Sequence, residues 1–292
     1  MRGNVLVTGG SGFVGRAVLR ELTGHGEAVT ATHTGRSGAQ PALPGVTWVE
    51  WDATLEPLPR VAWDRITAIL HLAAPPNLFD FPGQAAAMYE ITVAATFRLL
   101  EAARRYDIPR FVLASTGDVL GGSEGPAKED DPLYLPTSFY GASKAAAEIL
   151  LRSYEPLLST AVLRFYHPYG PGGGRFLINR LLRMVAEGKE VTIEGENGIL
   201  LNPVWIEDLA RGVLLALQSR ETGVFHLAGP DTETLRALLL RMGEIAGRPA
   251  VIRAIPGPGV ERHAGSFAKS ERLLGYRPRV SLNEGLRRLA SS

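Results

Sequence analysis

The sequence contains no cysteine, which excludes disulfide bonds, thiolate metal sites and cysteine nucleophiles. It also lacks a bias toward one sign of charge, because 31 lysines and arginines face 30 aspartates and glutamates, for a formal net charge of +1. No arm or face is visibly basic, so we expect no nucleic-acid partner. The six histidines lack the short spacing typical of metal ligands, and we therefore expect no metal.

Long apolar runs are missing as well. The first run ends after Val7, without the longer apolar stretch and cleavage site of a signal peptide. No later stretch approaches the roughly 18 apolar residues of a membrane-spanning helix. We therefore expect a cytoplasmic protein with no membrane partner.

What the sequence does contain is a regular alternation of strand and helix patterns. Short β-branched runs are followed by segments with apolar residues at helical spacing. The expected strands are 5–8, 28–32, 46–51, 68–73, 110–115 and 160–165, and the expected helices begin near 13, fill 84–106 and fill 140–154. This alternation predicts right-handed βαβ crossovers, and hence an α/β fold with a doubly wound parallel (Rossmann) sheet.

The pattern changes after Pro168. A glycine-rich loop precedes an amphipathic helix at 176–186, and short apolar runs at 204–206 and 224–226 indicate strands that could return to the main sheet. We expect two interleaved domains. They are a dinucleotide-binding domain of residues 1–167 plus about 203–228, and a smaller, helix-rich substrate-binding domain of residues 168–202 and 229–292.

A phosphate-binding turn is expected directly after the first strand, where Gly9, Gly12 and Gly15 fall three residues apart. The first glycine lets the chain turn, the second lets backbone approach a diphosphate, and the third lets helix pack on strand. Phe13 and Val14 lie in the same turn, and we expect Ser11 to cap the helix. A simple tight turn is the alternative.

The end of the second strand bears on the choice of cofactor. NAD-binding sites usually carry an acid there for the ribose 2′-hydroxyl, but this segment has His33 and Arg36 instead. Arg36 could meet a 2′-phosphate, so we expect NADP rather than NAD, although Arg36 could also be a solvated loop charge. Asp52, followed by Ala53, is placed to accept a hydrogen bond from adenine, or else to cap a turn.

A candidate catalytic pair lies at the start of the helix over 140–154. Tyr140 and Lys144 are four residues apart and so share one helix face. A nearby ammonium stabilises phenolate and lowers the pKa of a tyrosine, as general acid–base chemistry requires. Ser115 and Thr116 end the preceding strand at the carboxyl edge of the sheet, where such folds bind ligands.

Together these segments resemble the extended short-chain dehydrogenase/reductase family, in its NAD(P)-dependent nucleotide-sugar epimerase/dehydratase branch. The resemblance spans essentially the whole chain. It is carried by TGGSGFVG (8–15), HLAA (71–74), ASTGDVLG (114–121), YGASK (140–144), RFYHPYGPG (164–172) and the tail ERLLGYRPRVSLNEGL (271–286). The tail discriminates most, because a Rossmann domain by itself has no need for it.

The resemblance implies roles for particular residues. Tyr140 would be the acid/base, Lys144 its pKa-lowering and ribose-binding partner, and Thr116 the hydroxyl that bonds the reacting oxygen. The expected cofactor-binding residues are Gly9, Gly12, Phe13, Val14, Gly15, His33, Arg36, Asp52, Ala53, Leu72, Ala73, Ala74, Tyr140, Lys144, Tyr166 and His167. The expected substrate-binding residues are Pro75, Thr116, Asp118, His167 and Arg175.

The chain departs from the family pattern at four places. Thr92 stands where the family often has Asn, and His167 replaces the usual Asn of the NVYGP motif. The dehydratase Thr-Asp-Glu triplet is Thr116-Gly117-Asp118 here, with one acid missing, which makes dehydration less favoured. Leu201 occupies the position of a diphosphate-binding arginine.

These departures leave several functions open. We expect an epimerase or 4-ketoreductase acting on a secondary alcohol or ketone of a nucleotide-activated sugar, with NADP favouring reduction and NAD favouring epimerisation. The alternatives are the same chemistry on a non-nucleotide hydroxy or keto compound, which Leu201 favours, and a non-catalytic nucleotide-binding sensor or scaffold. Helical faces within 85–103 and at Ala145, Ile149 and Arg152 are expected to form a homodimer interface, or else to be plain core.

Overall fold

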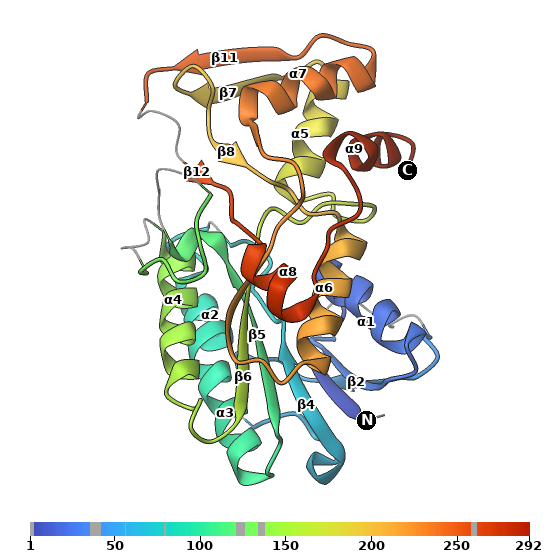
Figure 1. The fold of residues 1–292 in the computed structure, drawn as a ribbon, viewed down its shortest axis with the longest axis vertical. Helices are drawn as coiled ribbons and strands as arrows, with labels where there is room; N and C mark the ends of the chain where they lie inside the picture. The colour runs from blue at the N-terminus through green and yellow to red at the C-terminus, as the bar shows by residue number, and fades with distance from the viewer. Residues whose placement is uncertain are drawn as a thin grey trace.

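The computed structural model describes residues 3–35, 42–55, 57–78, 80–120, 126–133, 138–257 and 262–292. Within these ranges the main sheet has seven strands in the order β3-β2-β1-β4-β5-β6-β9 (Figure 1). Its strands are β1 (Asn4–Thr8), β2 (Ala28–His33), β3 (Val46–Glu50), β4 (Ile66–His71), β5 (Arg110–Thr116), β6 (Ser159–Phe165) and β9 (Gly223–Leu227). All neighbouring strands are parallel, and the strand order reverses between β1 and β4. The predicted doubly wound sheet is confirmed.

Helices cover both faces of this sheet. They are α1 (Phe13–Gly24), α3 (Ala95–Arg105), α4 (Phe139–Arg152) and α6 (Ile206–Gln218). α1 and α6 share a core cluster with Val5 and Val7 of β1, whereas α3 and α4 share a second cluster with Leu6. Successive side chains of a strand point to opposite faces, so a continuous apolar strand supplies both clusters.

The helix predicted over 84–106 is divided into three parts. A π-helical turn, η2 (Glu90–Ala94), separates α2 (Ala85–Tyr89) from α3. Side chains contact backbone carbonyls in this turn: Thr96 Oγ1 donates to the Thr92 carbonyl at 2.6 Å, and His71 Nε2 lies 3.0 Å from the Ile91 carbonyl. Such contacts compete with the regular helical ladder, and π turns of this kind are frequent at functional sites.

Most of the remaining elements pack above the carboxyl ends of the main strands (Figure 1). They are α5 (Leu177–Ala186), β7 (Glu190–Glu194), β8 (Leu200–Leu201), β10 (Glu233–Thr234), α7 (Leu235–Ala246), β11 (Val251–Ile255), β12 (Arg262–His263) and α9 (Leu282–Ala290). The short helices η1 (Trp63–Arg65) and η3 (Gly117–Val119) belong to the main-sheet layer, and α8 (Ala268–Leu274) lies beside α6. α5, α7 and α9 share a separate apolar core. None of the helices in the described ranges is both long and apolar enough to cross a membrane.

One strand prediction is wrong. The run at 204–206 forms no strand of the sheet: Val204 and Trp205 lead directly into α6, with only an isolated bridge between Trp205 and Tyr169. A short apolar run suits a buried strand and the start of a buried helix equally well, and periodicity cannot separate the two. The run at 224–226 does lie in a strand, β9, next to β6.

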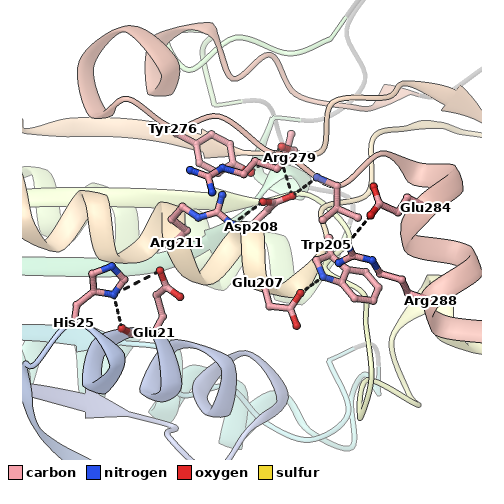
Figure 2. Close-up of polar contacts among 12 residues, drawn as sticks. Glu21, His25, Trp205, Glu207, Asp208, Arg211, Tyr276, Arg279, Glu284 and Arg288 are labelled. Carbon is pink, nitrogen blue, oxygen red and sulfur yellow. Dashed lines mark hydrogen bonds and ion pairs between the residues drawn. The ribbon is translucent and has the colours of Figure 1, made fainter. Parts of the chain in front are cut away.

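Asp208 explains why the tail motif belongs to this fold. Its fully buried carboxylate accepts backbone N–H bonds from Arg279 at 2.9 Å and Val280 at 2.8 Å, and it also accepts a bond from Arg211 at 3.1 Å (Figure 2). Tyr276 donates to the Ala228 carbonyl at 2.9 Å. These bonds hold the tail against α6 just before α9 begins. Within α9, Arg288 lies over the Trp205 ring (Figure 2).

Candidate active site

The turn between β1 and α1 leaves room for an anionic group. Gly9 has a φ of +70°, and a Cβ there would lie 2.8 Å from the Ala73 backbone, while a Cβ on Gly15 would lie 2.3 Å from the Gly9 carbonyl. A Cβ on Gly12 would approach only the Gly9 carbonyl, at 3.2 Å. Gly12 is also the N-cap of α1, and in the described part of the chain no side chain caps that helix. The expected cap by Ser11 is therefore wrong, and the first-turn N–H groups and the positive helix end remain available to a diphosphate.

The β4 end of the site is held by His71. Thr8 Oγ1 lies 2.6 Å from His71 Nδ1 and accepts the Ala73 N–H at 3.2 Å. Burial, followed by the charge of Lys144, lowers the pKa of His71 to about 3, so the ring is neutral. With Nε2 facing the Ile91 carbonyl, the proton belongs on Nε2 and Thr8 donates to Nδ1. This chain of bonds places Leu72 and Ala73 against the glycine turn, with Ala74 exposed and Pro75 buried beyond them.

The expected adenosine-binding residues gather around β2 and β3. His33 Nδ1 accepts the Gly35 N–H at 3.1 Å, and its ring packs edge-on to Trp48. Asp52 Oδ1 accepts bonds from the Thr54 N–H and hydroxyl, at 3.0 and 2.7 Å, which is the turn-capping role left open for it. Arg36 lies outside the described residues.

Thr116 and Tyr140 meet at the carboxyl end of β5. Burial, followed by the charge of the Asp118 carboxylate, raises the pKa of the Tyr140 phenol above its ordinary value, and hydrogen bonding with the Thr116 side chain acts to lower that pKa. This direction is opposite to the one expected from Lys144. The physical reasons are burial and the Asp118 carboxylate, while Lys144 Nζ donates to the Ala114 carbonyl at 2.8 Å.

Lys144 lies in a buried polar network. Burial lowers its pKa to about 8, although the charge of Glu148 acts to raise it. Glu148, one helical turn further along α4, accepts two bonds from Arg164, at 2.8 and 3.1 Å, and a short bond from Ser115. Only 2% of the Arg164 side chain and 5% of the Glu148 side chain are exposed. The network thus joins β5, β6 and α4 directly below the candidate acid/base.

Asp118 is accompanied by two histidines. Its backbone N–H donates to Thr116 Oγ1 at 3.3 Å, and its Oδ1 lies 3.6 Å from His263 Nδ1. His167 follows β6 with a positive φ of 44°, and its ring centroid is 6.3 Å from that of His263. Tyr166, by contrast, is buried, and its ring is in contact with Gly117 and Gly265, so its side chain belongs to the core.

Comparisons with known proteins identify the family of the chain. The model of the NAD dependent epimerase/dehydratase family matches residues 5–228. A dTDP-glucose 4,6-dehydratase from Streptomyces antibioticus is 31% identical over 98% of this chain and 90% of its own length. The chain belongs to the NAD dependent epimerase/dehydratase family, which is a family of enzymes.

Solved structures of family members show the same fold. The UDP-glucose 4-epimerase of Thermus thermophilus, in complex with NAD, has a TM-score of 0.84 and 28% identity, covering 99% of this chain and 98% of its own. MoeE5, in complex with UDP-glucuronic acid and NAD, has a TM-score of 0.83 and 29% identity, covering 97% of this chain and 96% of its own. Both neighbours carry NAD, and neither supports a preference for NADP.

Two further positions that the sequence singles out, Arg175 and Leu201, lie elsewhere in the structure. Arg175 is exposed on the loop before α5. Leu201 is fully buried in the core of α5, α7 and α9. Lys269 pairs with Asp130 at 2.9 Å.

Two residues near the candidate acid/base were not predicted from the sequence. His263 carries no motif and sits far along the chain from Asp118, so no spacing could have indicated it. Glu148 follows Lys144 by four residues, and this one-turn spacing was a usable signal for a second charge on the same helix face. In the described residues no group of three or more histidines or acids is arranged to hold a metal ion.

Proposed function

We propose that this chain catalyses NAD-dependent oxidation and reduction at a secondary alcohol or ketone of a nucleotide-activated sugar, most simply as an epimerase. The observation that carries the proposal is the placement of Thr116 at the carboxyl end of β5 beside Tyr140 and Lys144 of α4, in the same fold as an open glycine turn. In doubly wound sheets this edge is where ligands bind.

The residues present suit a dinucleotide. The uncapped first turn of α1, with Gly12 lacking a Cβ, would hold the diphosphate, and Lys144 would bind ribose hydroxyls. When bound, the nicotinamide ring supplies the hydride chemistry. Tyr140 would move the proton of the reacting oxygen, and the Thr116 hydroxyl would hold that oxygen in place.

NAD is the cofactor we propose. The sequence favoured NADP on the strength of Arg36, which lies outside the described residues, whereas the two family structures named above contain NAD. A retained NAD suits an epimerase, because the hydride that leaves the sugar returns to it.

One observation favours a second candidate, in which the same chemistry acts on a non-nucleotide substrate. Leu201 stands at the arginine position of nucleotide-sugar enzymes, and it is buried in an apolar core rather than directed toward a ligand. The sensor or scaffold function has no such support, because Thr116, Tyr140 and Lys144 are all present.

A homodimer is part of the proposal. Tyr89, Phe97 and Ile149 leave about half of each large apolar side chain exposed on the layer of α2, α3 and α4. Ala145, also expected in the interface, is buried within the chain and packs near Val119. Light scattering coupled to size-exclusion chromatography would give the mass in solution, and a monomer would refute this part.

The first experiment is to denature purified protein and identify any released nucleotide by mass spectrometry, and then to titrate the apoprotein with NADH and NADPH. We expect NAD to be released, or NADH to bind more tightly than NADPH. Turnover of UDP-glucose, UDP-glucuronic acid and dTDP-glucose is then measured with the intact protein and with Tyr140→Phe. Nucleotide binding without any turnover would favour the sensor function, and full activity of Tyr140→Phe would refute the mechanism.

A further inference from the structure

Three distant segments bring a carboxylate and two imidazoles to the candidate acid/base. Asp118 lies in η3 directly after β5, His167 follows β6, and His263 ends β12 at the boundary between the main sheet and the elements above it (Figure 1). The Asp118 backbone N–H donates to Thr116 Oγ1, and the charge of the Asp118 carboxylate raises the pKa of the Tyr140 phenol. The cluster therefore lies beside the side chains proposed to react. About a quarter of the Asp118 side chain and a third of the His263 side chain remain exposed.

The position of His263 is fixed by its neighbours. The Ala264 carbonyl accepts the Ala127 N–H at 2.8 Å, and the Asn202 side chain bonds both the N–H and the carbonyl of Gly265, at 3.1 and 2.8 Å. β12 also pairs with β8, which sets His263 beside Leu201. The chain therefore places an imidazole next to the position where the arginine of nucleotide-sugar enzymes is missing.

The cluster presents a negative charge and hydrogen-bonding groups. Burial acts to raise the pKa of Asp118, but the nearby imidazoles of His263, at 3.6 Å, and His167 outweigh it and hold that pKa below its ordinary value. Burial lowers the pKa of His167 to about 4, so its ring is neutral near pH 7. A ligand group at this place meets an ionised carboxylate that accepts hydrogen bonds, together with an imidazole that can donate or accept one.

We propose that Asp118 and His263 form a specificity subsite that binds a neutral hydroxyl group of the sugar and excludes a sugar carboxylate. The inference rests on the proposed function and adds a substrate class, namely nucleotide-activated neutral sugars rather than uronic acids. A hydroxyl can donate to Asp118 while it accepts a bond from His263. A substrate carboxylate has only acceptor atoms, and placing it beside Asp118 sets two like charges together in a half-buried site, which is costly.

The test compares UDP-glucose with UDP-glucuronic acid on NAD-loaded protein, by calorimetric binding and, separately, by turnover. For the unaltered chain we expect UDP-glucose to bind at least about 100-fold more tightly, because like-charge juxtaposition of several kcal/mol corresponds to more than two decades. Asp118→Asn, which keeps the shape and removes the charge, should reduce this ratio at least about tenfold. His263→Ala should weaken UDP-glucose binding about tenfold, since one hydrogen bond is lost.

The control is Asp130→Asn, which removes an exposed aspartate that is paired with Lys269 and should leave the ratio unchanged. Thermal unfolding of each variant checks that it is folded. Equal binding of the two sugars by the unaltered chain, or a ratio that Asp118→Asn does not move, would overturn the subsite. Turnover without discrimination would refute the subsite and keep the proposed function. Discrimination in binding without turnover would support the subsite and refute the proposed function, and failure of both sugars to bind would refute both.

Discussion

Removal of the Arg164 guanidinium should be among the most damaging single changes outside the apolar core. Arg164→Met keeps most of the side-chain volume but leaves the Glu148 carboxylate buried, with the bonds from Nε and Nη2 both lost. It also removes a 3.4 Å contact to the Glu129 carbonyl. What remains is a carboxylate that keeps its bond from Ser115 and lies near the Lys144 ammonium.

The magnitude follows from the burial of the pair. Breaking a buried ion pair by removal of one partner typically costs about 3–5 kcal/mol, because the remaining charge has lost its solvation and its partner. Replacing both partners by apolar groups of similar volume is often close to neutral. We therefore expect Arg164→Met to lower the free energy of unfolding by about 3 kcal/mol or more. The double variant Arg164→Met/Glu148→Met should be more stable than Arg164→Met, although it still carries the roughly 1–3 kcal/mol of leaving Ser115 without its acceptor.

Urea unfolding followed by circular dichroism at pH 7 measures these differences through the transition midpoint and slope. The matched control is Arg104→Met, which breaks the exposed pair with Glu101 on α3, where the two side chains are 50% and 33% exposed. A loss for Arg164→Met no larger than the loss for Arg104→Met would refute the reasoning. So would a double variant that is as unstable as the sum of the two single changes.

Three further predictions concern the candidate site. Tyr140→Phe should reduce kcat by about 10²–10⁴-fold, far more than it weakens NAD binding, as steady-state kinetics and a fluorescence titration would show; a smaller loss of kcat would argue against an acid/base role. Gly12→Ala should fold normally but bind NAD at least about tenfold more weakly. Gly9→Ala should instead lose about 1–3 kcal/mol of unfolding free energy, because the φ of +70° at Gly9 and the Ala73 backbone leave no place for a Cβ. Burial lowers the pKa of Lys144 to about 8, so its ammonium is present below that pH and lost above it; NAD affinity should therefore fall as pH rises through about 8, and Lys144→Met should abolish that dependence.

The sequence was sufficient for the parts of the molecule that local pattern determines. The inner strands of the sheet are parallel and largely buried on both faces, so each reads as a short apolar run. Gly9 and Gly15 of the β1–α1 turn are required at their positions by backbone contacts. The π turn at 90–94 was not predictable, because it depends on His71, which reaches the Ile91 carbonyl from another strand. Hydrophobic periodicity carries no information about such a contact.

In the candidate site, too, local spacing could be predicted from the sequence and tertiary contacts could not. Tyr140 and Lys144 could be paired from the sequence because they share one helix, but the direction of the Tyr140 pKa could not be obtained from their spacing. It depends on burial and on Asp118, which lies in η3 directly after β5. His263 reaches Asp118 only because Asn202 and Ala127 hold its strand in place. These are tertiary contacts, and they decide charge and specificity rather than fold.

One face of α4 carries both Glu148, which pairs with Arg164, and the candidate catalytic residues Tyr140 and Lys144. Tyr140, Lys144 and Glu148 follow one another at four-residue spacing, so they lie one turn apart along one side of the helix. Tyr140 meets Thr116 at the carboxyl edge of β5, Lys144 meets the Ala114 carbonyl, and Glu148 meets Ser115 and Arg164. Because β5 and α4 are joined by these contacts, a loss of the Glu148–Arg164 pair should change the electrostatic environment of Lys144 as well as the free energy of unfolding. Since the Glu148 charge raises the pKa of Lys144, the double variant should lose NAD affinity at a lower pH than the unaltered chain.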